Sequence, residues 1–403
     1  MSGLATHLIH SGREHLNDLG VHALPLDRST TYPISDLARA GISLNSLAHG
    51  APSAPDAVYA RLLNPTVARF ENAIASLEDA PEAVAFASGM AAVTAVLFAA
   101  KTIGNHVIAI RPVYGGTDHL LTSGMLGIDV TFATEADFHL ANRPDTSLIL
   151  LETPANPTLS LIDIEDVVSR AKGVAVLVDS TFATPVLQKP RLQGATLVLH
   201  SATKYIGGHG DTMGGVVAGD ADWCARIRGV RVATGAVLEP RAAYDLHRGL
   251  QTLGVRVEAA QANAIKVARW LSKHEGVSAV HFPGMGEDDR GLIGRQMKGP
   301  GAMVAFEVAG GYFQAAKIVE SVCLITAAVS LGSTDSLIQH PASLTHRVVD
   351  EEARNSCGIV PGLVRLSVGL EDAADLIADL AQALGIKTVS KAKSPQNCFT
   401  SAL

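Results

Sequence analysis

The sequence has 403 residues, of which 47% are hydrophobic and 18% charged, with a formal net charge of −7. This length and composition indicate a folded protein with a large α/β domain and at least one smaller domain. Basic and acidic residues are interspersed, which argues against nucleic acid as the main partner. No apolar run approaches the roughly 18 residues that a membrane helix requires, so we expect no membrane span.

The four cysteines are too scattered for a disulfide framework or a metal knuckle. They fit a reducing compartment, and the first 15 residues lack the apolar core of a secretory signal. We therefore expect a cytoplasmic protein.

Residues 1–55 contain many small residues, glycines and prolines and show little periodicity, which predicts an arm that crosses onto another surface. Tyr59 and Arg61 follow it. In an extended chain the two side chains point the same way and can bind an anion. The alternative is a surface arginine packed on a tyrosine. Pro65 then opens a predicted helix.

Residues 83–87 are a predicted buried strand, and Ser88, Gly89 and Met90 lead from it into a predicted helix over 91–100. A tight turn between a strand and a helix leaves free backbone N–H groups at the helix N-terminus, which can bind a phosphate. Many α/β proteins have such turns with nothing bound, so this turn alone indicates little.

From residue 107 onward strands and helices alternate, which predicts a mostly parallel sheet covered by helices on both faces. The predicted strands are residues 107–110, 148–152, 174–179 and 197–199, and the predicted helices are residues 116–126 and 163–172. In such sheets, ligands bind beyond the carboxyl ends of the strands.

Four side chains follow the ends of these strands, namely Tyr114, Asn156, Asp179 and Lys204. Each has an ordinary explanation by itself: an aromatic lid, a turn asparagine, a helix cap and a surface lysine. Together they suit pyridoxal 5'-phosphate. A carboxylate such as Asp179 keeps the ring nitrogen protonated, the amide of Asn156 can donate to the ring hydroxyl, and Tyr114 can stack on the ring.

Lys204 lies in the stretch LVLHSATKYIGGHGDTMGG, residues 197–215. A lysine amine at the end of a strand can form a Schiff base with an aldehyde cofactor and can then move protons. We expect the phosphate of the cofactor to be bound by Ser201 and Thr203 and by the backbone N–H groups of Gly89 and Met90.

Beyond about residue 250 the pattern changes to a long helical stretch over 249–274 and a possible strand over 277–283. We expect a PLP-binding domain over residues 56–250, a smaller C-terminal α/β domain over residues 251–386 and a disordered tail over residues 387–403.

Arg365 interrupts an alternating strand near the end of the second domain. It either faces solvent or holds a substrate α-carboxylate in a bidentate fork. His340 and His346 have no third ligand nearby, so we expect no metal site.

These residues stand in motifs that resemble the Cys/Met-metabolism family of pyridoxal-phosphate enzymes over roughly residues 4–386. The motifs are Tyr59-x-Arg61, Ser88-Gly89-Met90, Tyr114-Gly115-Gly116-Thr117, Glu152-x-Pro154-x-Asn156-Pro157, Asp179, His200-Ser201-Ala202-Thr203-Lys204-Tyr205 and Arg365-Leu366-Ser367-Val368-Gly369.

The resemblance implies PLP fold-type I and a homotetramer of two catalytic dimers. It also implies that Tyr59 and Arg61 hold the phosphate of the neighbouring subunit's cofactor. Arg365 matches the arginine that binds the substrate carboxylate, and Tyr114 matches the tyrosine that stacks on the ring and assists proton transfer.

The positions that separate subfamilies disagree. Methionine γ-lyases usually have a cysteine where this chain has Gly116, and a Lys-Asp pair where it has Arg231-Val232. Cystathionine γ-lyases and γ-synthases usually have a glutamate where this chain, like methionine γ-lyases, has Val329. We expect the adjacent Ser330 to bind substrate.

We expect a carbon–sulfur lyase that releases a thiol and ammonia from L-methionine, L-cystathionine or L-homocysteine and leaves a 2-oxo acid. Whether it performs γ- or β-elimination stays open. The alternative is a γ-replacement enzyme of the cystathionine γ-synthase or O-acylhomoserine sulfhydrylase type. A dinucleotide-binding protein is disfavoured because no G-x-G-x-x-G follows the first strand, and a non-catalytic homologue would be colourless.

Overall fold

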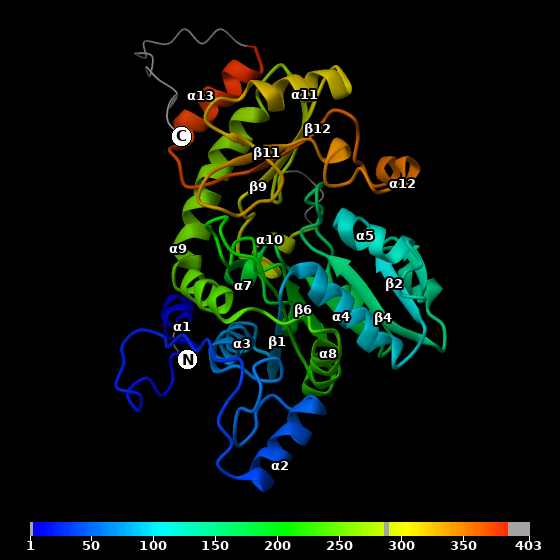
Figure 1. The fold of residues 1–403 in the computed structure, drawn as a ribbon. Helices are drawn as coiled ribbons and strands as arrows, with labels where there is room; N and C mark the ends of the chain where they lie inside the picture. The colour runs from blue at the N-terminus through cyan, green and yellow to red at the C-terminus, as the bar shows by residue number, and fades with distance from the viewer. Residues whose placement is uncertain (1–2, 286–289, 386–403) are drawn as a thin grey trace.

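A computed structural model describes residues 3–285 and 290–385. The chain forms two sheets in two lobes, joined by the long helix α9 (Pro240–Leu271), with an N-terminal segment at the foot of the molecule (Figure 1). The predicted tail over residues 387–403 lies outside the described residues.

The larger sheet has the strand order β1-β7-β6-β5-β4-β2-β3 in the described part of the chain. Strands β2 to β6 are parallel to their neighbours within that group, and β7 is antiparallel to β1 and β6. The strands are β1 (Glu82–Phe86), β2 (His106–Ile110), β3 (Asp129–Ala133), β4 (Thr146–Glu152), β5 (Ala175–Asp179), β6 (Leu197–His200) and β7 (Gly215–Gly219).

Helices cover both faces of this sheet, as predicted. Within β4, Leu148 and Leu150 pack with α4 and α8, whereas Ile149 and Leu151 pack with α6 on the opposite face. A strand buried on both faces reads as a continuous apolar run, which is why the sequence revealed it. The helices are α3 (Pro65–Leu77), α4 (Gly89–Lys101), α5 (Gly115–Thr122), α6 (Ile164–Arg170), α7 (Thr184–Leu187) and α8 (Ala221–Thr234), with short 3-10 turns at η1 (Phe138–Ala141) and η2 (Pro190–Gln193).

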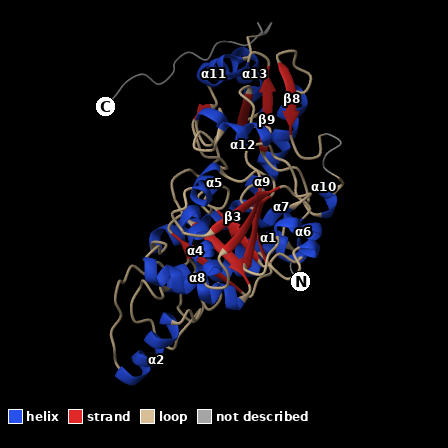
Figure 2. Cartoon of the chain, turned by 90° about the vertical axis from the view of Figure 1, so that its right-hand side faces the viewer, coloured by secondary structure: helices blue, strands red, loops and turns tan. Residues whose placement is uncertain are grey.

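The smaller sheet has the order β10-β11-β12-β9-β8 among the described residues and lies apart from the larger one (Figure 2). Within the described part of this smaller sheet, only β10 and β11 form a parallel pair. The elements of this lobe are β8 (Val277–His281), α10 (Leu292–Arg295), β9 (Met303–Val308), α11 (Gly311–Ser321), β10 (Thr326–Ala327), β11 (Leu337–Gln339), η4 (Pro341–Ser343), α12 (Glu351–Ser356), β12 (Leu363–Ser367) and α13 (Ala373–Ala383).

Helix α9 begins nine residues before the predicted start at residue 249. Glu239 caps it by accepting a hydrogen bond from the backbone N–H of Ala242, and Pro240 occupies its first turn. Its N-terminal half packs on the large lobe and its C-terminal half on the small lobe (Figure 1). The helix therefore belongs to both lobes, and the predicted boundary at residue 250 falls inside it.

The N-terminal segment contains two helices that its weak periodicity did not predict, α1 (Leu4–His10) and α2 (Leu37–Ala48). Helix α1 buries Leu8 against α9. Asp36 caps α2 by accepting hydrogen bonds from two backbone N–H groups. Helix α2 projects from the body (Figure 1) and buries Ala40 and Leu47, whereas its other large apolar side chains, Leu37, Ile42 and Leu44, are exposed.

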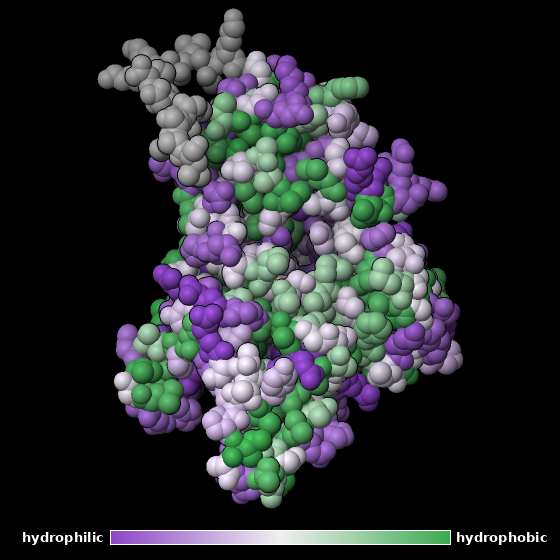
Figure 3. All heavy atoms as spheres, viewed as in Figure 1, coloured by the Kyte–Doolittle hydropathy of each residue, from purple (hydrophilic) through white to green (hydrophobic). Residues whose placement is uncertain are grey.

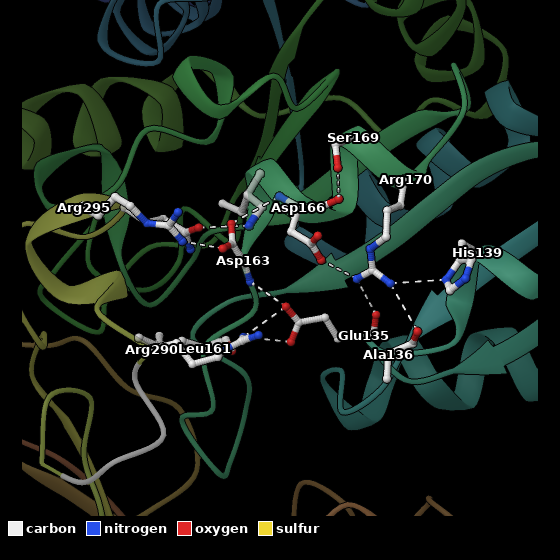
Figure 4. Close-up of polar contacts among 12 residues, drawn as sticks. Glu135, Ala136, His139, Leu161, Asp163, Asp166, Ser169, Arg170, Arg290 and Arg295 are labelled. Carbon is white, nitrogen blue, oxygen red and sulfur yellow. Dashed lines mark hydrogen bonds and ion pairs between the residues drawn. The ribbon is translucent and has the colours of Figure 1, made fainter.

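A network of charged side chains ties residues 290–295 to the large lobe (Figure 4). Arg290 pairs with Glu135 at 2.9 Å, and Arg295 pairs with Asp163. Arg290 also donates to the backbone carbonyl of Leu161 at 3.0 Å. These charges are partly exposed, so each pair contributes little stability, but together they hold residues 290–295 against the large lobe.

Candidate active site

A cavity of about 530 Å³ lies where the carboxyl ends of β4, β5 and β6 face the small lobe. It contains all four side chains that the sequence analysis placed at strand ends. Its polar and charged lining comes from both lobes: Ser88, Tyr114, Thr117, Glu152, Asn156, Asp179, Thr181, Ser201, Thr203, Lys204, Ser330, Thr345 and Arg365. A second cleft, of about 670 Å³, is lined by residues at the ends of β2 and β3 and by residues of β8 in the small lobe. It contains none of the predicted site residues.

Lys204 follows β6 in a turn in which its backbone N–H donates to the carbonyl of Ser201 at 3.1 Å. Its amine donates to the hydroxyl of Ser330, 2.7 Å away. Burial, with the positive charge of Arg365, lowers the pKa of Lys204 to about 8. The amine is therefore neutral near neutral pH in a far larger fraction of molecules than an ordinary lysine, and the neutral amine is the nucleophile.

Asp179 ends β5 and stands beside Glu152, the last residue of β4, in the sheet register. It accepts hydrogen bonds from the backbone N–H and hydroxyl of Thr181 at 3.0 and 2.5 Å. Burial raises the pKa of Asp179, and the Thr181 bonds and His200 oppose that rise. A cationic ring nitrogen held here would stabilise the carboxylate, in agreement with the predicted role.

The N-terminus of α4 packs tightly against the turn that leads to Lys204. A Cβ on Gly89 would lie 2.9 Å from the Cβ of Ser201, so the close approach requires glycine. Ser201 and Met90 line the cavity, which places hydroxyl and backbone N–H donors together for a phosphate. The Thr203 hydroxyl also donates to the Gly214 carbonyl at 3.2 Å and so holds the glycine-rich loop.

Arg365 in β12 is 2% exposed and lines the cavity, which excludes the solvent-facing alternative. It donates to the side-chain oxygen of Asn156 at 2.7 Å and to the backbone carbonyl of Ser330 at 2.8 Å. The side-chain amide of Gln339 also faces Arg365. When this amide is turned so that its oxygen points toward the guanidinium, the oxygen accepts hydrogen bonds from Arg365. Because the Asn156 oxygen is occupied, its NH₂ group can donate into the cavity, as predicted for the ring hydroxyl.

Ser330 has a φ of +87°, which is uncommon for a residue with a side chain. In this conformation its hydroxyl reaches Lys204 and its carbonyl reaches Arg365. The strained backbone therefore connects the lysine to the arginine.

Tyr59 and Arg61 lie outside this cavity. Arg61 donates to the carbonyl of Val232 at 2.7 Å, and its guanidinium lies 5.5 Å from the centre of the Tyr59 ring. In a single chain the pair thus adopts the surface arrangement that the sequence analysis kept as an alternative.

The sequence matches the family described as Cys/Met metabolism PLP-dependent enzyme over residues 5–385. The chain belongs to this family. It is 55% identical over 383 residues to an L-methionine gamma-lyase of Brevibacterium aurantiacum, with 94% of this chain and 93% of that protein covered.

Solved structures of family members match the fold closely. One is apo CalE6, described as a methionine gamma lyase from Micromonospora echinospora, with a TM-score of 0.83, 36% identity and coverage of 95% of this chain and 99% of that one. Another is a cystathionine gamma synthase from Xanthomonas oryzae pv. oryzae in complex with aminoacrylate and cysteine, with a TM-score of 0.86, 35% identity and coverage of 95% and 98%. The fold alone therefore does not separate lyases from synthases.

Family membership confirms PLP fold-type I, pyridoxal 5'-phosphate as the cofactor, and a PLP-dependent carbon–sulfur lyase. The donor set of the cavity fits this cofactor, because it joins a lysine amine of lowered pKa, a carboxylate and a glycine-lined N–H cradle. Among the described residues, no His, Cys, Asp or Glu cluster is arranged to hold a metal ion. Nor is any helix of residues 3–285 or 290–385 long and apolar enough to cross a membrane.

The two sequence departures from methionine γ-lyases have different structural meanings. Arg231 is buried, pairs with Glu71 at 2.5 Å and donates to the carbonyl of Ala85 at 2.9 Å, so its role is to join α8 to α3 and β1. Gly116 instead lies beside the cavity, where a Cβ would be 2.6 Å from a ring carbon of Tyr114. Gly116 therefore lies against a predicted site residue, Tyr114, whereas Arg231 contacts Glu71 and Ala85.

Replacing Gly116 with alanine is expected to lower kcat about tenfold, because the Tyr114 ring must shift to admit the new methyl group. Gly229→Ala in α8 is the matched control, since nothing lies within 4 Å of its Cβ. Steady-state kinetics of both variants would measure the effect. A Gly116→Ala enzyme with the wild-type kcat would show that the Tyr114 ring position is not critical.

Recombination of the apoprotein with pyridoxal phosphate is expected to become faster as pH rises toward about 8 and to level off above it. The reason is that only the neutral amine of Lys204 attacks an aldehyde, and burial has lowered its pKa. Stopped-flow absorbance would follow the rate. A rate that continued to increase up to pH 10 would contradict a lowered pKa for this lysine.

Proposed function

We propose that the chain acts on L-methionine by γ-elimination. Water and methionine would give methanethiol, 2-oxobutyrate and ammonia. The observation that carries this proposal is a group of apolar side chains that line the cavity. An apolar lining suits the uncharged methylthio end of methionine and does not suit the second, charged amino-acid group of cystathionine. The group is formed by Met90, Met213, Val329 and Leu344. The relatives named L-methionine gamma-lyase support it.

Pyridoxal phosphate, when bound, would supply the electron sink that makes the proton on the amine-bearing Cα, and then those on Cβ, acidic. Arg365 binds the α-carboxylate and so fixes one end of the substrate. Lys204 accepts the Cα proton and, once it has passed that proton on, accepts a second proton from Cβ before the sulfur departs. Tyr114 lines the same cavity and can protonate the departing thiolate.

A substrate panel tests the proposal. Purified enzyme would receive L-methionine, L-cystathionine, L-cysteine, or O-acetylhomoserine with and without a thiol, and keto acids and thioethers would be measured. 2-Oxobutyrate from methionine as the fastest reaction is the expected result. Pyruvate from cysteine alone would indicate β-elimination, and a thioether from the ester without any keto acid from a sulfur amino acid would identify a γ-replacement enzyme.

We also propose a homotetramer of two catalytic dimers in which Tyr59 and Arg61 complete the cavity of a second copy. Two observations support it: the pair lies outside the cavity of its own chain, and the projecting segment exposes apolar side chains over α2 (Figure 3). These side chains are Ile34, Leu37, Ile42 and Leu44. Such a surface is typical of an interface.

Mixing two inactive variants, Arg61→Ala and Lys204→Ala, tests this arrangement. Random re-association should restore about a quarter of the wild-type sites, because half of the dimers are mixed and each mixed dimer contains one intact site. Sedimentation would give the mass of the assembly against 42.0 kDa for one chain. No recovery of activity, or an active monomer, would contradict the proposal.

We further propose a cytoplasmic location. The thiols of Cys224, Cys323 and Cys357 are free in the structure, which fits a reducing compartment. Cell fractionation with an antibody against the chain would test it.

A further inference from the structure

Glu152 is a buried carboxyl group inside the cavity to which the sequence analysis gave no role. It is 5% exposed and lies beside Asp179 in the sheet. Two neighbouring buried carboxyl groups are unfavourable unless something compensates for them. The contacts of Glu152 show what compensates.

Each oxygen of Glu152 accepts a hydrogen bond from the backbone of a different loop. Oε2 accepts from the N–H of Tyr114 at 2.7 Å, and Oε1 accepts from the N–H of Asn156 at 3.0 Å. Tyr114 lies after β2 and Asn156 after β4. Asn156 in turn accepts from Arg365. A single carboxyl group thus connects the loops that bear the aromatic ring and the amide, and reaches the arginine indirectly.

The loop of Tyr114 is also confined by the backbone of the small lobe. A Cβ on Gly115 would lie only 2.1 Å from the backbone carbonyl oxygen of Thr345 in the small lobe. The start of α5 is therefore held between Thr345 and Glu152. If the bond to Glu152 were lost, the backbone N–H of Tyr114 would have to seek another acceptor, and the ring would move with it.

We propose that Glu152 is a positioning residue, which holds the Tyr114 ring and the Asn156 amide at fixed places around the bound cofactor and, through Asn156, orients Arg365. The inference rests on the cofactor chemistry of the proposed function and not on which sulfur amino acid reacts. Burial and the charge of Asp179 raise the pKa of Glu152, and the two backbone N–H groups oppose that rise. The same two bonds thus make the buried group tolerable.

Glu152→Gln tests the inference with almost no change in shape. A glutamine offers one oxygen and one NH₂ group, so one of the two loop N–H groups faces a donor and loses its acceptor. We expect kcat/KM to fall about 10- to 100-fold. We also expect a changed visible circular dichroism of the bound cofactor and weaker binding of pyridoxal phosphate to the apoprotein, both measured without substrate.

Glu71→Gln is the matched control. Glu71 is a buried carboxylate that also accepts from a backbone N–H, that of Ala85 at 2.7 Å, but it lies outside the cavity. We expect it to lower the melting temperature and to leave the dichroism and kcat/KM unchanged.

The inference would be overturned if Glu152→Gln, like the control Glu71→Gln, had a lower melting temperature but wild-type dichroism, cofactor affinity and kcat/KM. If the wild-type enzyme released no keto acid from any sulfur amino acid, the proposed function would fail. The dichroism and cofactor affinity of the variant would still decide the role of Glu152.

Discussion

Replacement of Lys204 by alanine should reduce turnover by at least about a thousandfold, because it removes both the covalent attachment of the cofactor and the group that moves the Cα proton. The side chain lines the cavity, with its amine 2.7 Å from the Ser330 hydroxyl. The visible absorbance of the lysine-bound cofactor should be lost together with the activity.

The fold should survive this substitution. Burial disfavours the charged lysine, as its lowered pKa shows, so alanine removes a group that is costly to bury. Lys273→Ala, at an exposed position after α9, is the control and should keep wild-type kinetics and absorbance. Turnover by Lys204→Ala at more than a few per cent of the wild-type rate would show that another base performs the chemistry.

The centre of the fold could be predicted from the sequence because its strands carry a strong local signal. Strand β4 contains an unbroken apolar run over residues 148–151 and ends in Glu152, and β6 ends shortly before Lys204. Strand β7 was missed. It begins and ends with glycine, which is depleted in strands, and it lies antiparallel in a sheet that the alternation of strands and helices predicts to be parallel.

The strand-end residues of the site could be predicted for a geometrical reason. In a parallel sheet the carboxyl ends of the strands meet at one edge, so Asn156, Asp179 and Lys204 must converge whatever the details of packing. Their contacts with the small lobe could not be predicted from any pattern. Ser330 is 126 residues from Lys204, and Arg365 is 209 residues from Asn156.

Two other features depend on surroundings that a single sequence does not reveal. The importance of Gly116 is visible only when the Tyr114 ring is placed beside it. Glu152 stood in a quoted motif, and an acidic residue at the end of an apolar strand was a signal that could have identified it. The role of Glu152 became clear only from the two backbone N–H groups that donate hydrogen bonds to it.

Arg365→Lys should raise the KM for an α-amino acid roughly 10- to 100-fold, since lysine keeps the charge but loses the planar fork that pairs with a carboxylate. The loss is specific to the carboxylate. Norleucine and pentylamine, which differ by that group, would be used as inhibitors, and only norleucine should bind more weakly to the variant.

Arg170→Lys is the control for a general effect of changing arginine to lysine. Arg170 pairs with Asp166 and donates to the carbonyl of Glu135 at 2.7 Å (Figure 4), and it is not among the residues that line the cavity. In Arg365→Lys the oxygen of Asn156 or the carbonyl of Ser330 also loses a donor, so some stability should be lost as well. Equal weakening of norleucine and pentylamine would mean that Arg365 only supports the cavity wall. Selective weakening of norleucine would identify it as the group that binds the substrate carboxylate.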